Sequence, residues 1–240
     1  MKPKVRVDIV TPVYYKEAQT IVERILKQFA YCTKNLTDYD WKLVIANNGL
    51  KKDVREATRT LIKKYPRIRW SDTDNQGRGW SLAETWLKSD ADLFVYMDAD
   101  LATNMNSLHP MIHLLKNKEA DIAIGSRYIK GANASRTLQR LILSKTYNLL
   151  LNTILGLNVK DAQCGFKGIT RKAVQELIPL TKDRKFFFDT ELLYYGQLRG
   201  YTLVEIPVEW TEQEETSVHI VHVTLSYLAH IFRLWNMGKK

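Results

Sequence analysis

Short apolar runs and helix-forming segments alternate through the first half of the chain. Val5–Val10 has the composition of a buried strand, and a helical pattern follows over Ile21–Cys32. The same alternation predicts further strands at 43–46, 68–70, 93–97 and 122–124, with helices at 54–65, 81–88 and 108–116. Because strand–helix–strand successions build parallel sheets covered on both faces, the chain is expected to be an α/β protein with a mostly parallel, doubly wound, Rossmann-like sheet.

The regular alternation of predicted strands and helices ends after Gly125. A basic loop is followed by a long helix at 138–155, a strand at 166–169, helices beginning at Arg171 and Phe188, and a last strand at 203–208. No linker rich in Pro, Gly or Ser divides the chain. We therefore expect one domain over residues 1–216, in which the second half elaborates the first.

Residues 217–240 are expected to form an amphipathic helix. Val221, Leu225, Leu228, Phe232 and Trp235 recur at intervals of three and four residues, and no acidic residue follows Glu215. Such a helix suits an anionic membrane surface, but a helix packed on its own domain needs the same periodicity, so both placements stay open.

The chain has no apolar run near the ~18 residues of a membrane-spanning helix. Its two cysteines, Cys32 and Cys164, are too few for a disulfide framework and favour a reducing compartment. We therefore expect a cytoplasmic protein, peripheral at the cytoplasmic membrane face.

The composition is basic, with 36 Lys and Arg against 26 Asp and Glu and a formal net charge of +10. This balance favours polyanionic partners such as nucleotides, phosphates or anionic lipid. A nucleic-acid-binding protein is a distant alternative, but no nucleic-acid motif accompanies the basic stretch at 63–69. Nucleic acid is therefore not expected as a partner.

A pair of carboxylates follows the predicted strand at 93–97, in the order Asp98-Ala99-Asp100. Ligands bind at the carboxyl ends of strands in such sheets, and hard oxygen ligands suit Mg²⁺ or Mn²⁺. An Asp-x-Asp pair alone is a weak signal, and a solvated turn is its alternative interpretation.

Three further loops are expected at the same edge of the sheet. The first contains Pro12 and Tyr14, the second Asn47, and the third Asn75 and Arg78 before a helix start. Ring, amide and backbone groups there suit a nucleotide base and ribose, and a cation near a helix N-terminus suits phosphate. The third loop lacks the full glycine fingerprint of a dinucleotide-binding protein.

An ordered series of motifs completes the pattern. It comprises Ile124-Gly125-Ser126-Arg127-Tyr128, the segment Arg140–Ser144, the loop Asp161–Lys167 and the segment Phe188–Leu193. From about Val7 to about Trp210 the chain resembles the inverting glycosyltransferases of the GT-A fold, in particular the branch of dolichyl-phosphate mannose synthases and dolichyl-phosphate glucosyltransferases.

This resemblance implies a hexose transfer, of mannose or glucose, from GDP-mannose or UDP-glucose to a polyprenyl phosphate, with Mg²⁺ or Mn²⁺. Residues 1–216 would be the catalytic domain. The implied roles are nucleotide-sugar binding by Pro12, Tyr14, Glu17, Asn47, Asn75, Arg78, Asp98 and Ala99; metal binding by Asp98 and Asp100; acceptor-phosphate binding by Arg127, Arg140 and Ser144; and closure of the catalytic site by Asp189 and Glu191.

The acceptor determines whether a catalytic base is needed. A phosphate monoester has a second pKa of ~6 and is already a nucleophile at neutral pH, whereas a sugar hydroxyl requires a base. For a glycan or other hydroxyl acceptor, which is the alternative, Asp189 or Glu191 would be that base. Both also fit a simple role at the start of a helix.

Three positions depart from the pattern of the resembled family. Asn47 stands where an Asp is usual, so the contact to the base or ribose has lost a charge. Ala102 stands where many members have Gln, so the third metal ligand is expected to be water or absent. The acidic run Glu212-Gln213-Glu214-Glu215 replaces a basic, glycine-containing loop.

Overall fold

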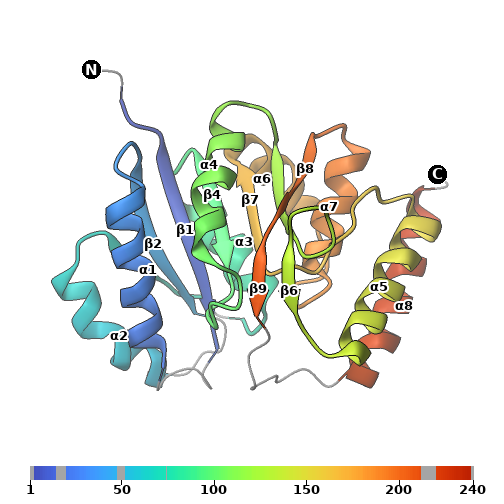
Figure 1. The fold of residues 1–240 in the computed structure, drawn as a ribbon, viewed down its shortest axis with the longest axis horizontal. Helices are drawn as coiled ribbons and strands as arrows, with labels where there is room; N and C mark the ends of the chain where they lie inside the picture. The colour runs from blue at the N-terminus through green and yellow to red at the C-terminus, as the bar shows by residue number, and fades with distance from the viewer. Residues whose placement is uncertain (1–2, 15–19, 48–51, 74, 212–219, 239–240) are drawn as a thin grey trace.

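The computed structural model describes residues 3–14, 20–47, 52–73, 75–211 and 220–238, with side chains throughout except at 52–53, 220–226 and 238. Its centre is a seven-stranded sheet in the order β3-β2-β1-β4-β7-β5-β8 (Figure 1). The strands are β1 (Arg6–Val13), β2 (Asp40–Asn47), β3 (Ile68–Ser71), β4 (Leu93–Met97), β5 (Ile122–Ser126), β7 (Phe166–Thr170) and β8 (Leu203–Pro207). The predicted α/β class and mostly parallel sheet are confirmed.

Strand β7 is antiparallel to both of its neighbours, β4 and β5, while the other pairs in the sheet are parallel. Met97, the last residue of β4, therefore pairs with Phe166, the first residue of β7. The loop that precedes β7 consequently lies at the same edge of the sheet as the carboxyl end of β4. This reversal brings a late segment of the chain against the Asp98–Asp100 turn.

Helices cover both faces of the sheet (Figure 1). One face packs against α1 (Ile21–Asn35), α2 (Lys52–Lys64) and α4 (Leu108–Lys116), and the other against α3 (Arg78–Lys88), α6 (Arg171–Leu177) and α7 (Phe188–Leu198). All five residues of β4 are buried, as an apolar strand covered on both faces should be. The predicted helices and strands are found with small differences at their ends.

A second, two-stranded sheet was not predicted. It pairs β6 (Asn133–Ser135) with β9 (Glu209–Thr211) in parallel, and β6 lies inside the segment expected to be a basic loop. Each strand has three residues, which is too short to show a period of two. The backbone N–H of Thr211 donates to the carbonyl of Ala102 at 2.9 Å, and Thr103 pairs with Trp210, so β9 lies beside the segment that follows Asp100.

Helices α5 (Leu138–Leu155) and α8 (Ile220–Gly238) lie side by side at one end of the sheet (Figure 1). On α8, Ile231 and Leu234 are buried, whereas Phe232 is 59% exposed. One face of α8 thus packs on the rest of the chain while apolar side chains stay exposed on another. Within the described residues, no helix combines the length and the apolar composition that a membrane span requires.

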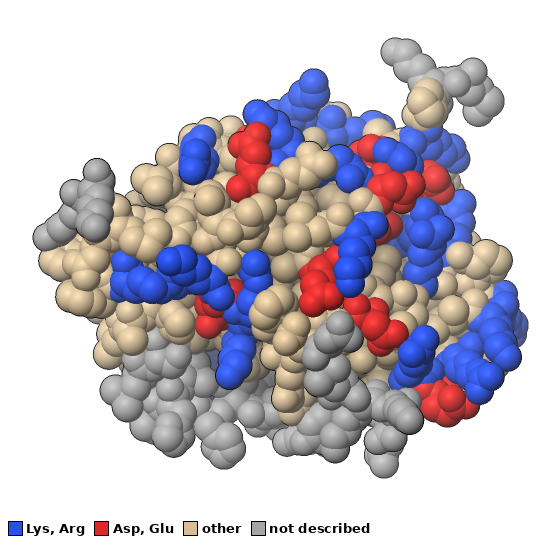
Figure 2. Space-filling model, turned by 180° about the vertical axis from the view of Figure 1, so that it is seen from behind, with Lys and Arg blue, Asp and Glu red and all other residues tan. Residues whose placement is uncertain are grey.

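The rear face of the molecule carries charges of both signs. Figure 2 shows Lys and Arg interspersed with Asp and Glu and separated by uncharged areas. Nucleic-acid-binding proteins typically gather their basic residues in one patch or stripe. This face carries no continuous stripe of that kind among its described residues.

Candidate active site

The turn after β4 presents the Asp98–Asp100 pair. The backbone N–H of Asp98 donates to the Gly165 carbonyl at 3.0 Å, and the Asp100 carboxylate accepts from the Ala102 N–H at 3.0 Å. Leu101 has a φ of 56°, in the left-handed region that a residue with a side chain seldom adopts. This strained turn holds the two carboxylates at the carboxyl end of β4.

Gly165 lies directly against Asp98. A Cβ atom on residue 165 would fall 1.7 Å from Oδ2 of Asp98, a distance that no side chain tolerates. The loop before β7 therefore acts as a wall behind this carboxylate, and glycine is required because the backbone itself makes the contact.

The Asp98–Asp100 pair fits a hard divalent cation. The Asp98 side chain is 41% exposed at the end of the strand, so a cation can approach it from solvent. Loss of hydration raises the pKa of Asp98 to about 6, helped by the neighbouring carboxylates of Asp100 and Asp189 and opposed by Arg78. Close carboxylates that repel one another are a donor set suited to Mg²⁺ or Mn²⁺. In the described part of the chain, no group of three or more His, Cys, Asp or Glu is placed to hold a metal.

Arg78 connects Asp98 with Asp189. Its guanidinium reaches Oδ1 of Asp98 at 3.3 Å and Oδ2 of Asp189 at 2.6 Å. It lies at the start of α3, after Gly77, whose φ of 150° and contact with the Arg184 carbonyl require glycine. Arg78, predicted to bind the nucleotide sugar, thus brings together two acidic site residues that are far apart in sequence.

Asp189 is fully buried and has cationic and hydroxyl partners on both oxygens. Lys167 Nζ lies 3.0 Å from its Oδ1, and the Tyr96 hydroxyl donates to the same oxygen. Burial alone would raise the pKa of Asp189, but Lys167 and Arg78 lower it below the ordinary value. An ionised carboxylate with both oxygens engaged positions its neighbours and is a weak proton acceptor.

The partners of Glu191 differ from those of Asp98 and Asp189. Its fully buried carboxylate accepts from the backbone N–H groups of Lys182 and Asp183, the latter at 2.9 Å, and pairs with Arg233 of α8. The structure therefore places Glu191, predicted to close the catalytic site, where it anchors α8 and the segment before α7.

Strands β1, β2 and β3 end at the same edge of the sheet as the Asp98–Asp100 turn, because all three are parallel to β4. Pro12 and Val13 pair with Ala46 and Asn47 in the sheet, and the Tyr14 hydroxyl accepts from Gln76 at 2.9 Å. The backbone N–H of Asn75 donates to Thr73 at 3.2 Å. Four predicted nucleotide-side residues, Pro12, Tyr14, Asn47 and Asn75, thus lie on converging segments, and Ala99 is buried between the two carboxylates. Glu17 and the run 212–215 lie outside the described residues.

Asp72 was not predicted on this side. Its carboxylate accepts from Asn47 at 3.3 Å and from the Trp70 indole at 2.6 Å. An acidic group therefore stands next to Asn47 although that position itself has lost its charge. Asp72 directly follows the short strand β3, and this position at a strand end could have identified it as a candidate nucleotide-side residue.

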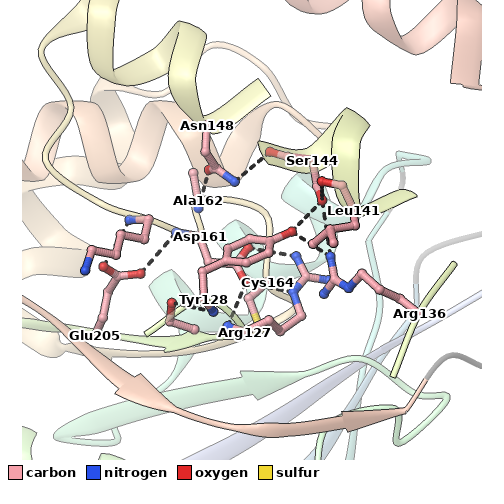
Figure 3. A network of polar contacts seen from close by, with 12 residues as sticks. Arg127, Tyr128, Arg136, Leu141, Ser144, Asn148, Asp161, Ala162, Cys164 and Glu205 are labelled. Atoms are coloured by element: carbon pink, nitrogen blue, oxygen red, sulfur yellow. Dashed lines mark hydrogen bonds and ion pairs between the residues drawn. The ribbon is translucent and has the colours of Figure 1, made fainter. Parts of the chain in front are cut away.

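Arg127 is engaged by a buried partner. Its Nε and Nη2 donate to the two oxygens of Asp161 at 2.7 Å each, and its backbone N–H donates to Asp161 at 3.0 Å (Figure 3). Burial opposes the guanidinium charge, but the Asp161 hydrogen bonds and charge raise the pKa of Arg127 overall. Arg127 was predicted to bind the acceptor phosphate, but its Nε and Nη2 groups are already hydrogen-bonded to Asp161.

Ser144 lies near Arg127, on α5. Its hydroxyl contacts the Tyr128 hydroxyl and donates to the Arg140 carbonyl at 2.6 Å (Figure 3). Arg140 lies one helical turn earlier on the same side of α5. Arg136, which was not predicted, also reaches Ser144 Oγ, at 3.2 Å. Three polar side chains from the segment after β5 and from α5 thus meet near Arg127.

Lys167 is the clearest residue that sequence reasoning missed. It occupies the second position of β7 and is 1% exposed, between buried Phe166 and Gly168. A lysine is almost never fully buried unless it is paired. A charged residue inside an otherwise apolar strand was therefore a signal for a buried partner, which the structure identifies as Asp189.

Comparison with known proteins gives the family. The profile for Glycosyl transferase family 2 matches residues 8–178. The glycosyltransferase AglD of Haloferax volcanii is 32% identical over 232 residues, covering 96% of this chain and 37% of AglD. A dolichyl-phosphate beta-glucosyltransferase of Trichomonas vaginalis is 32% identical over 94% of this chain and 72% of its own length, and the human enzyme of that name is 24% identical over 97% and 79%.

The solved structures agree on the fold. Glucosyl-3-phosphoglycerate synthase from Mycobacterium tuberculosis, in complex with UDP, superposes with a TM-score of 0.72 at 13% identity, over 97% of this chain and 80% of that one. Another structure of that enzyme contains Mn²⁺, UDP-glucose and phosphoglyceric acid, at a TM-score of 0.72 and 12% identity. At this identity the likeness shows the shared GT-A fold. The profile match, which covers most of the sheet and its Asp98–Asp100 turn, shows that the chain belongs to Glycosyl transferase family 2.

Proposed function

We propose that the protein transfers glucose from UDP-glucose to a polyprenyl phosphate with inversion at the anomeric carbon. The names of several relatives at 23–32% identity support this choice of sugar and acceptor over mannose from GDP-mannose. The Mn²⁺ and UDP-glucose bound in a protein of the same fold support the donor and the metal.

One observation carries the choice of acceptor. The two carboxylates that would serve as a base, Asp189 and Glu191, are both fully buried and paired with cations. A hydroxyl acceptor needs a base, whereas a phosphate monoester with a second pKa of ~6 is largely ionised at neutral pH. If these two carboxylates have structural roles, neither is available as a base. The site then suits an acceptor whose attacking oxygen is already ionised, such as a phosphate monoester.

Asp98 and Asp100 would hold the Mg²⁺ or Mn²⁺ ion. When bound, such a cation stabilises the charge that develops on the departing nucleotide diphosphate. Arg78 orients Asp98 through its 3.3 Å contact, and the Gly165 backbone closes the space behind it. These residues set the direction in which the carboxylates present their oxygens.

The acceptor phosphate would bind on the other side of the Asp161–Gly165 segment, toward α5. Ser144 and Arg140 lie there on one side of that helix. Arg127 would act by positioning, because its bidentate pair with Asp161 holds the segment that ends at Gly165. A guanidinium that already makes a bidentate pair with one carboxylate cannot make the same bidentate pair with a second anion.

The proposal includes peripheral contact with the cytoplasmic face of a membrane, with residues 1–216 as the catalytic domain and 217–240 as its membrane-facing helix. The support is a set of exposed apolar side chains on neighbouring helices: Leu138, Ile142, Leu143, Leu149 and Ile154 of α5, and Leu228, Phe232, Trp235 and Met237 of α8. We call this set the α5–α8 apolar surface. Exposed apolar side chains gathered on one part of a protein mark sites of contact with membranes or other proteins.

The test is a transfer assay with purified protein, Mg²⁺ or Mn²⁺, polyprenyl phosphate and either labelled UDP-glucose or labelled GDP-mannose. We expect label in the organic phase from UDP-glucose, and none after chelation of the metal. Label that appears only on a water-soluble sugar acceptor would show that the acceptor is a hydroxyl group and would contradict the proposal.

A further inference from the structure

Arg136 is a cation whose hydrogen-bonding capacity is only partly used. Its Nη1 donates to the Tyr128 hydroxyl at 2.6 Å and to Ser144 Oγ at 3.2 Å. Its Nε and Nη2 are shielded from solvent and have no hydrogen-bond partner. Buried guanidinium N–H groups normally find acceptors, so these two donors point to an acceptor that the protein itself does not supply.

The excess positive charge around Arg136 also favours binding of an anion. Burial and the neighbouring Arg127 guanidinium both lower the pKa of Arg136. The Asp161 carboxylate is paired with Arg127, and its charge only partly offsets the lowering at Arg136. No carboxylate in the described part of the chain forms a salt bridge with Arg136. The two arginines and the single aspartate thus leave one positive charge over, in a place where water is partly excluded.

Aromatic rings fix the position of this guanidinium. Its carbon Cζ lies 5.1 Å from the centre of the Tyr128 ring and 4.9 Å from that of Trp210. Stacking of this kind restricts a long side chain and keeps it in one plane. Figure 3 shows Arg136 reaching toward Tyr128 and Ser144, while Arg127 turns toward Asp161.

Trp210 also relates Arg136 to the Asp98–Asp100 turn. It belongs to β9, and it pairs with Thr103, three residues after Asp100. The guanidinium is therefore stacked on a residue that is held to the same segment as the candidate metal ligands. A ligand bound by Arg136 and Ser144 would be next to the place where the donor diphosphate is expected.

We propose that Arg136 is the guanidinium that grips the phosphoryl group of the acceptor, with Ser144 as its hydrogen-bonding partner and Arg127 as a positioning residue. This inference rests on the proposed function. The side chain of Arg136 is partly exposed, so an anion can reach it from solvent, and a turn of the guanidinium within its stacked plane gives its two unpartnered nitrogens an acceptor. The arrangement adds Arg136 to the acceptor-phosphate residues that the motif positions gave as Arg127, Arg140 and Ser144, and changes the role of Arg127 from binding to positioning.

The test compares Arg136→Gln and Arg136→Lys with Arg59→Gln, an exposed arginine on α2 that pairs only with Glu56 among the described residues. With saturating UDP-glucose, Arg136→Gln should raise the KM for polyprenyl phosphate at least tenfold. Arg136→Lys should give a smaller rise, because it keeps the charge but loses the fork. The KM for UDP-glucose and the Tm should stay near those of the parent protein in all three variants.

A binding measurement separates this inference from the proposed function. Calorimetric titration with citronellyl phosphate, a short soluble polyprenyl phosphate, should show binding to the parent protein and to Arg59→Gln, and at least tenfold weaker binding to Arg136→Gln. If the parent protein transfers glucose to polyprenyl phosphate but Arg136→Gln keeps the parent acceptor KM, the role of Arg136 is wrong and the proposed function stands. If the parent protein makes no lipid product yet binds citronellyl phosphate through Arg136, the proposed function is wrong and the anion site stands. Equal binding by the parent and Arg136→Gln would overturn the anion site.

Discussion

Two acidic pairs in this protein have the same spacing but opposite surroundings. Asp98 and Asp100 flank Ala99 in a turn after a strand, whereas Asp189 and Glu191 flank Thr190 in the first turn of α7. Residues two apart on a helix point in different directions. Asp189 accordingly meets Arg78 and Lys167, while Glu191 meets α8. In the turn, by contrast, Asp98 stays partly exposed. The backbone that carries an acidic pair, and not its spacing, decides whether the pair can share a metal.

The comparison predicts its largest effect on catalysis at the first pair. Asp98→Asn or Asp100→Asn should lower kcat on the order of 1,000-fold, because a metal that stabilises the leaving group contributes several kcal/mol to the barrier. The Tm should change little, since these carboxylates are not sealed in the core. Glucose transfer and thermal unfolding, measured on the same preparations, check both statements. A variant with parent activity would remove the metal role from this pair.

The second pair should affect folding most. Asp189→Asn leaves Lys167 and Arg78 without their shared carboxylate, and breaking a buried pair in this way costs about 3–5 kcal/mol. Urea unfolding at pH 7 measures this loss. A variant that lost activity at an unchanged unfolding midpoint would instead make Asp189 a direct participant in the reaction.

Acid titration sharpens the same point. The pKa of Asp189 is lower in the folded protein than its ordinary value of 3.8, so its contribution to stability is present at neutral pH and is lost as the pH falls through the folded pKa. The stability of Asp189→Asn should therefore depend less on pH than that of the parent protein below about pH 4. Parallel curves for the two proteins would show that Asp189 does not titrate in this range.

Gly165 offers a smaller, indirect way to disturb the first pair. Gly165→Ala places a Cβ against Oδ2 of Asp98 and must displace the carboxylate. A shift near 1 Å at a reacting group costs about 100-fold in rate. Gly156→Ala is the control, because its Cβ would meet nothing within 4 Å, although its left-handed φ lowers stability slightly. Similar kcat values for the two variants would show that the backbone of residue 165 does not set the position of the Asp98 carboxylate.

The smallest effect is expected at the α5–α8 apolar surface. Replacing Phe232 and Trp235 by Ser should weaken binding to anionic liposomes about tenfold, because it removes two exposed apolar side chains that would contact lipid. Soluble activity toward citronellyl phosphate should persist. Unchanged sedimentation with liposomes would assign this surface to a different partner.

Much of the fold follows from local pattern. Strands such as β4 and helices such as α1 are long enough to show their periods, and Asp98 and Asp100 were located because strand ends meet at one edge. The sheet formed by β6 and β9 has no such pattern. For Arg127, the motif indicated the residue but not its partner. Asp161, which lies 34 positions later and is brought beside it by tertiary packing, decides its role.

The reversed direction of β7 has a consequence for how this protein can be altered. Residues 127–165 leave the sheet at the end of β5 and return at the start of the adjacent β7, so the segment departs from and rejoins the same edge. It contains Arg136, α5 and Ser144, and it spans no strand of the central sheet. Such an excursion can be exchanged as a unit between relatives of the same fold, provided that β6 still pairs with β9 and α5 still packs on α8. Chimeras joined at these two points would carry a new acceptor element on an unchanged set of donor-side strands.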